Sequence, residues 1–265
     1  MTGCRDLVTI TIVSHGHGPL LVRLLNDLNC LPSCEGVATI VTLNSPGELL
    51  DPSPFPNLRI RVIRNTLPKG FAANQNQAFE HCATPWFAVL NPDLRITDDV
   101  FATLISRAAL DRRIALVAPV VQNSQGQLED SERANLTPWS VIRRLGNKLR
   151  SSATVGSNGF RWYAGMFYLI RSDSFAEING FDDRYFLYCE DYDFCARLYL
   201  KGHRLLQEKS ASVVHDAQRS SHRSIRYSWF HLKSLLRVWA SAPVWKIAFH
   251  DLFWRSDPGG VSSRA

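Results

Sequence analysis

The sequence contains no apolar run long enough to cross a bilayer, and its six cysteines show no metal-ligand spacing. Its first residues, MTGCRDLVTITIVSHGHG, hold a short apolar stretch that two threonines interrupt, and no basic segment precedes that stretch. The pattern predicts a buried strand and argues against a signal peptide. We therefore expect a cytoplasmic protein whose cysteines stay reduced.

Acidic residues are absent from one long segment near the C-terminus. Residues 219–250 contain no Asp or Glu, whereas Arg, Lys, Trp and Phe are frequent there. The whole chain has a net charge of +6 and an isoelectric point of about 9.1, which favours an anionic partner such as nucleotide phosphate, acidic lipid or nucleic acid. A basic nucleic-acid-binding protein without transferase activity is therefore an alternative, although no RNA- or DNA-binding motif is present.

Hydrophobic residues make up 45% of the 265-residue chain and charged residues 20%, which predicts a packed core. Runs rich in β-branched residues alternate with runs of helical apolar spacing. The expected strands are 7–13, 37–43, 58–64, 86–90 and 114–121, and the expected helices are 20–28, 70–82 and 97–110, the last with Thr97 as its N-cap. This alternation predicts the α/β class, with a mostly parallel, Rossmann-like sheet flanked by helices.

The rest of the chain has a different character. Residues 122–160 are polar and predict an irregular segment, and residues 161–171 again have strand character. We expect one domain over residues 1–218 and a basic amphipathic helical extension over residues 219–265. In the extension, one apolar stripe carries basic residues on its flank, and it fits either contact with an anionic membrane or packing on the domain. The stripe consists of Ile225, Trp229, Leu232, Leu236 and Trp239, and the basic flank of Arg226, Lys233 and Arg237.

Two groups of acidic residues stand at positions where chemistry is expected. Asp93 directly follows the strand 86–90 and Pro92, and ligands of parallel sheets bind beyond the carboxyl ends of the strands. Its carboxylate suits a divalent cation that carries a diphosphate, or it caps the turn; the local residues leave both interpretations open.

The second group lies in the segment YFLYCEDYDF, residues 185–194, where a helix is expected to begin near Glu190. The helix dipole stabilises acids in a first turn. A carboxylate beside a partly apolar pocket also gains proton affinity and becomes a better general base. The pattern favours a functional role for Asp191 and its neighbours.

These pieces together resemble the family 2 glycosyltransferases of the GT-A fold, particularly their bacterial rhamnosyltransferase-like branch. The matching segments stand in family order over roughly residues 7–225. They read TIVSHG, LPKGFAANQNQAF, VLNPDLRI, WYAGMFYLIRSDSF, INGFDDRYFLYCEDYDFCARL and VVHDAQRSSHRS.

The resemblance implies a reaction and its partners. It implies an inverting transfer of rhamnose or another hexose from a nucleotide-diphosphate donor, dTDP-rhamnose or a UDP-sugar. The implied acceptor is a glycan or a lipid-linked molecule in bacterial cell-surface polysaccharide biosynthesis, meaning O-antigen, lipopolysaccharide or capsule. The implied cofactor is a divalent metal, Mg²⁺ or Mn²⁺. A lipid-linked acceptor would bring the enzyme to the inner face of the cytoplasmic membrane as a peripheral protein.

The resemblance also implies roles for individual residues. Asp191 would be the catalytic base, with Glu190 positioning either it or the acceptor. Asp93 corresponds to the last acid of the metal motif, in which Asn91 replaces the first acid, and His215 corresponds to a metal ligand or phosphate contact. The residues implied at the nucleotide sugar are Val13, Ser14, Asn44, Gly70, Phe71, Asn74, Asn76, Asn91 and Asp93, with Gly70 permitting close backbone approach. The residues implied on the acceptor side are Trp162, Tyr163, Asp182 and Asp183; for the two aromatic residues, sugar stacking and core packing both remain open.

Overall fold

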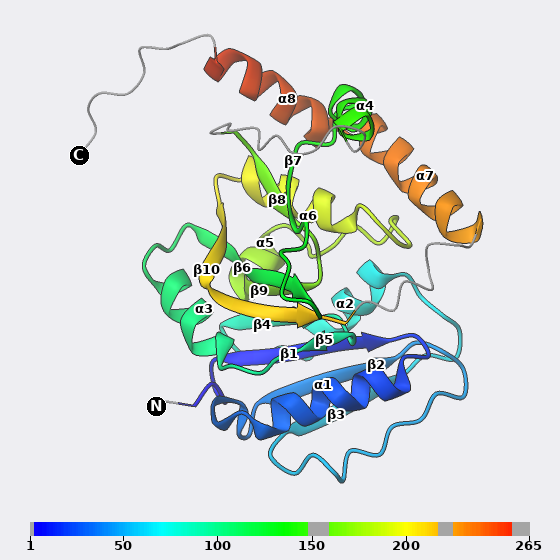
Figure 1. The fold of residues 1–265 in the computed structure, drawn as a ribbon, viewed down its shortest axis with the longest axis vertical. Helices are drawn as coiled ribbons and strands as arrows, with labels where there is room; N and C mark the ends of the chain where they lie inside the picture. The colour runs from blue at the N-terminus through cyan, green and yellow to red at the C-terminus, as the bar shows by residue number, and fades with distance from the viewer. Residues whose placement is uncertain (1–2, 148–158, 217–224, 256–265) are drawn as a thin grey trace.

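The computed structural model describes residues 3–147, 159–216 and 225–255 (Figure 1). Its main sheet has eight strands in the order β3-β2-β1-β4-β9-β6-β10-β5. The strands are β1 (Val8–Ser14), β2 (Ala38–Leu43), β3 (Arg59–Arg64), β4 (Trp86–Leu90), β5 (Leu94–Arg95), β6 (Ile114–Asn123), β9 (Phe167–Arg171) and β10 (Arg204–His215). A second sheet pairs β7 (Glu132–Ala134) with β8 (Arg161–Tyr163).

The sheet is parallel except at two strands. Parallel pairs join β1 to β2 and β4, β2 to β3, and β6 to β10. By contrast, β9 runs antiparallel to both β4 and β6, and β5 runs antiparallel to β10. The expected α/β class with a mostly parallel sheet is thus confirmed. The reversal at β9 brings the chain before it to the edge where the parallel strands end.

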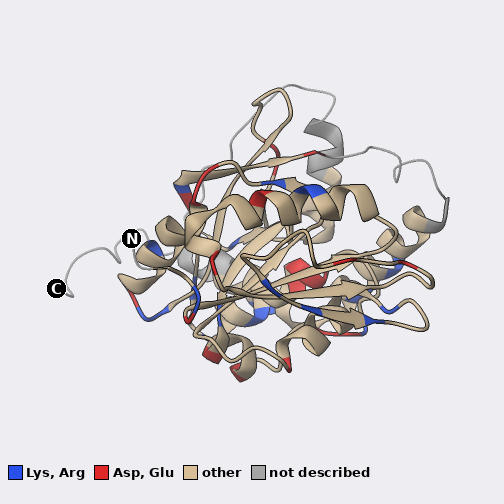
Figure 2. Cartoon of the chain, turned by 90° about the horizontal axis from the view of Figure 1, so that it is seen from below, with Lys and Arg blue, Asp and Glu red and all other residues tan. Residues whose placement is uncertain are grey.

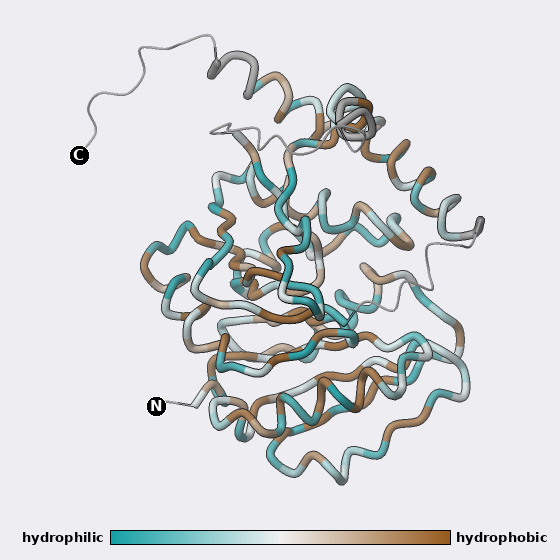
Figure 3. The backbone as a smooth tube through the Cα atoms, viewed as in Figure 1, coloured by the Kyte–Doolittle hydropathy of each residue, from teal (hydrophilic) through white to brown (hydrophobic). Residues whose placement is uncertain are grey.

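Helices cover both faces of the sheet. One face packs on α1 (Gly18–Cys30) and α3 (Val100–Ala109), and the short helix η1 (Pro32–Cys34) follows α1. The other face packs on α2 (Phe71–Phe79), α5 (Ser172–Glu177) and α6 (Glu190–Leu200). Apolar residues follow the central strands in Figure 3, as a sheet buried on both faces requires. Because helices cover both faces, a ligand site is expected at the loops that follow the carboxyl ends of β1, β4 and β10.

Three local expectations were wrong. Helix α3 begins at Val100 with Asp99 as its N-cap, and not at Thr97. The carboxylate of Asp27 accepts a hydrogen bond from the Ile96 backbone N–H at 3.1 Å and so keeps the preceding chain extended. The expected strand 161–171 is divided between β8 and β9, and the described part of 122–160 contains β7 and α4 (Pro138–Asn147).

Two further helices, α7 (Ile225–Ala240) and α8 (Ala242–Arg255), lie together with α4 at the end of the molecule opposite α1 (Figure 1). Their buried residues Val238, Val244 and Ile247 join the core cluster that also contains the buried side of α6, and α8 contacts α6 directly. In the expected stripe, Trp229, Leu232 and Leu236 are exposed, so packing uses a neighbouring stripe of α7. Within the described ranges, no helix is both long enough and apolar enough to cross a membrane.

Candidate active site

The segments that follow β4 and β10 meet at the carboxyl edge of the sheet. Asp93 precedes Leu94, which pairs with His215 in the antiparallel register of β5 and β10. The Asp216 backbone N–H donates to the Asp93 carbonyl oxygen at 2.9 Å, which fixes the two segments together. The expected neighbourhood of Asp93 and His215 is therefore present, although 122 positions separate them in the sequence.

His215 lies between two carboxylates. Its Nε2 is 3.1 Å from Asp93 Oδ2, and its Nδ1 is 2.9 Å from Glu129 Oε2. Burial alone would lower the pKa of His215, but the two carboxylates outweigh it and raise this pKa to about 9. Burial would likewise raise the pKa of Asp93, yet the contact with His215 holds it below its usual value. At neutral pH the site therefore holds an imidazolium between two carboxylates.

Glu129 was missing from the sequence-based expectations. It follows the polar turn after β6, in the acidic stretch EDSE of residues 129–132, which matches no motif. Its backbone N–H donates to the Val121 carbonyl oxygen at 2.9 Å, which returns the chain to the strand and aims the side chain at His215. The pairing of β6 with β10 brings Glu129 to His215, and spacing along the sequence does not show this.

The residues at this edge fit a divalent cation with few protein ligands. Asp93 Oδ1 is buried and has no hydrogen-bond partner, so one carboxylate oxygen is available to a cation. No group of three or more His, Cys, Asp or Glu side chains in the described part of the chain is arranged to hold a metal by itself. A cation here would therefore depend on Asp93, on the neighbouring Asn91, and on oxygens of the substrate and water. His215, as an imidazolium with both ring nitrogens on carboxylates, fits the expected phosphate contact better than the expected metal ligand.

The loop after β1 is fixed by an acid that the sequence did not single out. Ser14 Oγ donates to Glu48, and the Gly16 backbone N–H donates to the same carboxylate at 3.1 Å. The His17 backbone N–H in turn donates to Ser14 Oγ at 3.2 Å, and the charge of His17 helps to lower the pKa of Asp93. Ser14 thus lies at the expected edge, beside a histidine that faces the same site.

The amides expected at the nucleoside are engaged inside the protein. Asn44 Oδ1 accepts hydrogen bonds from Asn65 Nδ2 at 2.8 Å and from the Lys69 backbone N–H at 2.9 Å. Asn74 Oδ1 accepts from the same Asn65 nitrogen at 2.7 Å, and both Asn44 and Asn74 are buried. Their polar atoms hold the turn before α2. The structure therefore gives Asn44 and Asn74 a supporting role, since a buried, paired amide is costly to redirect.

Gly70 and Asn76 join the donor side to the acceptor side. A Cβ atom at Gly70 would lie 2.7 Å from the Phe186 carbonyl oxygen, and the Phe71 backbone N–H donates to that oxygen at 3.0 Å. Asn76 bonds both the N–H and the carbonyl of Phe181, at 2.9 and 2.8 Å. The close approach that the structure shows at Gly70 is thus to the segment before α6.

The predicted helix start at Glu190 is confirmed, and a strained backbone precedes it. Tyr188 and Cys189 have φ of 70° and 65°, a left-handed conformation that costs energy for residues other than glycine. Asp191 is half-buried at this start; its Oδ2 accepts from the Gly165 N–H at 3.3 Å and its Oδ1 from the Tyr192 N–H at 2.8 Å. The strained turn and these bonds fix the direction of the Asp191 carboxylate.

Glu190 and Asp191 have raised proton affinity, whereas Asp193 serves the structure. Burial raises the pKa of Asp191, and burial together with the neighbouring Asp191 charge raises the pKa of Glu190 well above its usual value. Glu190 Oε2 is buried without a hydrogen-bond partner. Asp193 instead forms an ion pair with Arg197 at 2.6 Å, and Arg197 donates to the Ile178 carbonyl oxygen. The acids of this turn therefore divide into Glu190 and Asp191, which have no ion-pair partner among the described residues, and Asp193, which has one.

A short chain of contacts connects this acid to the metal motif. The Asn91 backbone N–H donates to the Met166 carbonyl oxygen at 2.9 Å, and the adjacent Gly165 donates to Asp191. The antiparallel pairing of β9 with β4 produces this arrangement, because Phe167 lies opposite Leu90. Asn91 and Asp191 thus lie at the same edge of the sheet, and we name this region, from Asp93 to Asp191, the cleft.

The expected acceptor-side residues lie near this cleft, but most are engaged. Trp162 and Tyr163 are buried, and Trp162 packs edge-on against Tyr192 with ring centroids 5.7 Å apart. Core packing is therefore their role here, and not an open stacking surface. Asp182 holds Arg184 through two hydrogen bonds from Nε and one from Nη2 at 2.6 Å, whereas Asp183 is exposed.

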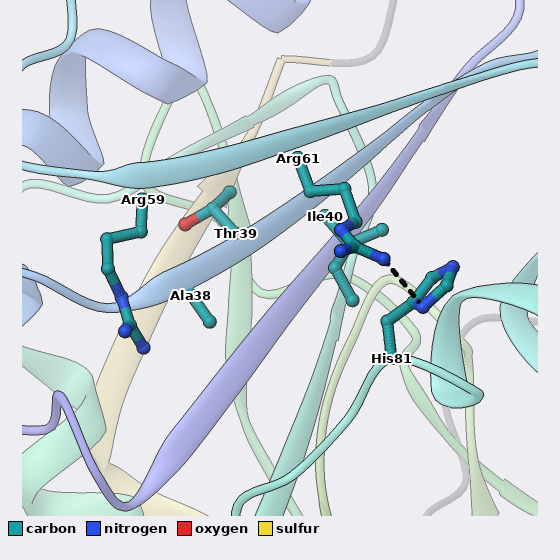
Figure 4. Close-up of a pocket in the computed structure, with 6 residues that line it drawn as sticks. All are labelled: Ala38, Thr39, Ile40, Arg59, Arg61 and His81. Carbon is teal, nitrogen blue, oxygen red and sulfur yellow. Dashed lines mark hydrogen bonds between the residues drawn. The ribbon is translucent and has the colours of Figure 1, made fainter.

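Two hollows lie outside the Asp93–Asp191 cleft. One, of about 360 Å³, faces β2 and β3 and is lined by Arg59, Arg61, His81 and neighbours (Figure 4). Its arginines lie on the edge strand β3, where exposed charge prevents pairing with another chain. The other, of about 570 Å³, includes Glu129 in its lining and so adjoins the site.

Comparison with known proteins gives a consistent result. The model of "Glycosyl transferase family 2" matches residues 49–174. The chain is 30% identical over 249 residues to "Rhamnosyltransferase WbbL" of Escherichia coli K12, covering 88% of this chain and 93% of that protein. It is 26% identical over 247 residues to an "N-acetylglucosaminyl-diphospho-decaprenol L-rhamnosyltransferase" of Mycobacterium tuberculosis, covering 82% of this chain and 78% of that protein.

Solved structures share the fold at lower identity. A mannosyltransferase from Pyrobaculum calidifontis, in complex with GDP-Man and Mn²⁺, matches 97% of this chain and 77% of its own with a TM-score of 0.60 and 16% identity. GalNAc-T7 with UDP, GalNAc and Mn²⁺ matches 88% of this chain and 47% of its own with a TM-score of 0.63 and 16% identity. At this level of sequence identity, both comparisons show a shared fold and nothing further.

Proposed function

The chain belongs to glycosyltransferase family 2, and on that premise we propose that it transfers rhamnose or another hexose with inversion at the anomeric carbon. The proposed donor is a nucleotide-diphosphate sugar, dTDP-rhamnose or a UDP-sugar. The proposed acceptor is a glycan or a lipid-linked molecule of bacterial cell-surface polysaccharide synthesis. The named activities of the two curated relatives support rhamnose as the sugar to test first.

The observation that carries this proposal is the pair of contacts joining Asn91 to Met166 and Gly165 to Asp191. These contacts put a carboxylate of raised proton affinity in the same cleft as Asp93. A displacement with inversion needs the acceptor hydroxyl to attack from the side opposite the leaving diphosphate. A base on one side and an anion-stabilising group on the other meet that need.

In the proposed mechanism, Asp191 takes the proton of the acceptor hydroxyl as the oxygen attacks. Its raised pKa brings it closer to the working pH, which makes it a stronger base than an ordinary carboxylate. Glu190, buried next to it, has a pKa raised by burial and by the neighbouring Asp191 charge, so its carboxyl favours the neutral form. The Gly165 N–H holds the direction of the carboxylate through this step.

On the donor side, Asp93 and Asn91 would hold a divalent cation together with the diphosphate, as the unpartnered Asp93 Oδ1 favours. The imidazolium of His215 would add positive charge beside the diphosphate. The chemistry supplied by Mg²⁺ or Mn²⁺ there is neutralisation of charge on the leaving group. His17, at the first turn of α1, adds a group that can donate to a phosphate oxygen. The Mn²⁺ in the two structural neighbours supports a metal of this class.

A panel of nucleotide sugars tests the proposal without knowledge of the acceptor. Release of nucleoside diphosphate is measured for dTDP-rhamnose and several UDP-sugars, with Mg²⁺, with Mn²⁺ and with EDTA. We expect metal-dependent hydrolysis of one donor and its loss in Asp93→Ala, with an Arg64→Gln variant on the opposite sheet edge as control. Turnover of no donor, or equal turnover with EDTA, would contradict the donor or the metal assignment.

We also propose peripheral membrane contact through α4, α7 and α8. Large exposed apolar side chains gather on these helices, and we call them the apolar face: Trp139, Ile142, Trp229, Leu232, Leu236, Trp245 and Phe249. The segment 219–250 contains no acid, and the exposed Lys233 and Lys246 lie among these residues. Elsewhere acidic and basic residues are interspersed (Figure 2), so this end differs in chemistry from the rest. Exposed aromatic side chains next to basic ones fit an anionic lipid surface.

A further inference from the structure

The stretch of chain before α6, residues 184–189, determines where the proposed base points, and we call it the leading segment. At its end, Tyr188 and Cys189 have positive φ, a conformation that residues other than glycine keep only where the surrounding structure holds it. Asp191 lies two positions beyond, in the first turn of α6. A rotation at this turn would therefore move the Asp191 carboxylate away from the Gly165 N–H, which donates to it.

Helix α7 contacts the middle of the leading segment. The ring of Phe230 stacks on the ring of Phe186, with centroids 5.1 Å apart. The buried Ser234 donates from Oγ to the Leu187 carbonyl oxygen at 2.9 Å. These contacts hold a side chain and a backbone group directly before the strained turn.

Two more residues of α7 extend the contact to both ends of this stretch. Arg237 donates from Nη1 to the Arg184 carbonyl oxygen, and its guanidinium carbon lies 5.6 Å from the centroid of the Tyr185 ring. His231 packs beside Tyr188, with ring centroids 5.3 Å apart. Each of residues 184–188 thus has a contact with α7.

Helix α2 lies against the same segment. The Phe71 backbone N–H donates to the Phe186 carbonyl oxygen at 3.0 Å, and the missing side chain of Gly70 leaves room for this approach. That hydrogen bond lies at Phe186, whereas the contacts of α7 reach Tyr188, where the strained turn begins. Of these two helices, α7 is therefore the one beside the turn.

The inner contacts of α7 follow one face of the helix. Phe230, Ser234 and Arg237 are spaced by four and three residues, which places them in one row on a helix surface, and we call them the clamp. The residues that α7 contributes to the apolar face lie outside this row and are exposed. A substitution in the clamp therefore leaves the apolar face unchanged.

We propose that the clamp positions the catalytic base. By holding the leading segment, it stabilises the strained turn and so directs the Asp191 carboxylate at the attacking hydroxyl. Phe230, Ser234 and Arg237 are positioning residues, because they contact the leading segment and act through it. This inference rests on the proposed transferase function. It makes α7 part of the catalytic unit, whereas the sequence alone predicts an extension outside the domain.

Hydrolysis of the donor tests this role with water in place of the acceptor. Asp191 would deprotonate the attacking water, so kcat with the donor found in the hydrolysis panel depends on where this carboxylate points. We expect the double variant Phe230→Ala, Ser234→Ala to lower kcat by about 10-fold or more, because small displacements of a reacting group are costly. The KM for the donor and the calorimetric affinity for its nucleoside diphosphate should change by less than about 2-fold. Phe230→Tyr keeps the stacked ring and should retain the wild-type kcat.

Val238→Ala is the matched control on the same helix. Val238 is fully buried in the core cluster that also contains the buried side of α6, so its truncation removes packing and leaves the clamp in place. We expect it to lower the melting temperature and to leave kcat unchanged at a temperature where the protein is folded. Loss of stability alone would then not explain the lower kcat of the double variant.

Hydrogen exchange measures the same contacts without the reaction. We expect the double variant to raise the exchange rates of the backbone amides of residues 184–192 by about 10-fold, because loss of the contacts favours local opening of this segment. Exchange in the central strands β1 and β4 should stay as in wild type. This measurement follows the leading segment and the amide of Tyr192, which donates to Asp191.

Four outcomes would overturn the inference. The folded double variant could keep the wild-type kcat, its donor affinity could fall together with kcat, or residues 184–192 could exchange as in wild type. In the fourth, the double variant would lower kcat by the same factor in an Asp191→Asn background, although a clamp that acts through Asp191 has no further effect there. If wild type hydrolyses no donor, the proposed function fails on that measurement, and hydrogen exchange still decides whether the clamp holds the leading segment.

Discussion

At the scale of single residues, acids that lie close together in the sequence differ in the groups that they contact. Asp191 accepts two backbone hydrogen bonds and faces the cleft, whereas Asp193, one position beyond Tyr192, is neutralised by Arg197. Their pKa values are both raised by burial, so a titration argument alone would not distinguish them. The ion pair does distinguish them, because a carboxylate bound to guanidinium at 2.6 Å is a poor proton acceptor.

Substitution of Asp191 by Asn should therefore abolish transfer and leave the donor bound. We expect kcat to fall by about 10²–10⁴-fold with little change in the KM for the donor, because a general base acts in the transition state. Steady-state kinetics with a matched acceptor measures this. Asp193→Asn is the control in the same helix and should lower the melting temperature more than it lowers kcat. Near-normal turnover of a folded Asp191→Asn protein would place the base elsewhere.

Glu190 offers a test by pH dependence. Its folded-state pKa is raised above the unfolded value of about 4.3, so the native state binds the proton more tightly and stability falls as pH rises above that value. Glutamine does not titrate, so the melting temperature of Glu190→Gln should increasingly exceed that of wild type from pH 4 to pH 8. Glu177 has a lowered pKa through His203, so the stability that wild type gains over Glu177→Gln should already be present above pH 4.5 and should be lost only below it. A pH-independent difference would contradict burial of the Glu190 carboxyl.

Much of this site could be anticipated from the sequence, and the exceptions have a common physical origin. Asp93, Glu190 and Asp191 follow or begin elements whose ends local patterns predict. Glu129 lies in a polar stretch with no periodicity, and only strand pairing brings it to His215. Asn44 and Asn74 were expected to contact the nucleotide sugar, but in the structure their amide oxygens accept hydrogen bonds from Asn65. Spacing along the chain does not show these hydrogen bonds.

At the scale of elements, buried strands were the most predictable feature, since β1, β2 and β4 are apolar runs bounded by Gly, Pro or Asn. The split between β8 and β9 was not predictable, because RWYAGMFYLIR is continuously apolar on both sides of Gly165. The break exposes the Gly165 N–H to Asp191. A tertiary hydrogen bond thus interrupts a segment that local propensity would leave whole.

The junction between α2 and the segment before α6 gives a second element-scale test. A Cβ at Gly70 would meet the Phe186 backbone at 2.7–2.8 Å, which backbone atoms cannot relieve by a rotamer change. Gly70→Ala should therefore destabilise the fold by about 1–3 kcal/mol. Gly18→Ala, at the first position of α1 with nothing within 4 Å of the added Cβ, is the control and should be neutral or slightly stabilising. Chemical denaturation measures both, and equal stability of the two variants would contradict the close contact.

At the scale of the whole molecule, helix α7 connects the segment before Asp191 with the apolar face. It contributes His231, which packs beside Tyr188 with ring centroids 5.3 Å apart, and also Trp229, Leu232 and Leu236, which are 62%, 46% and 53% exposed. Ser234 Oγ donates to the Leu187 carbonyl oxygen at 2.9 Å, so the helix is anchored to the segment that leads to the base. Membrane contact through α7 would thus place the cleft at a fixed distance from the lipid surface.

Vesicle co-sedimentation tests this arrangement. Each surface-proximal Lys or Arg contributes on the order of 1 kcal/mol toward anionic lipid, so binding should be reversible, should require anionic vesicles and should weaken with salt. The variant carrying Trp229→Gln, Leu232→Gln and Leu236→Gln should lose most of this binding while it keeps donor hydrolysis, because these side chains are exposed. The matched control changes Leu7, Val22 and Leu110 to Gln; these side chains are also exposed, but none lies on α4, α7 or α8, and binding should persist. If wild type fails to bind anionic vesicles at low salt, or if both triple variants bind equally, the apolar face does not contact lipid and the acceptor must be sought in solution.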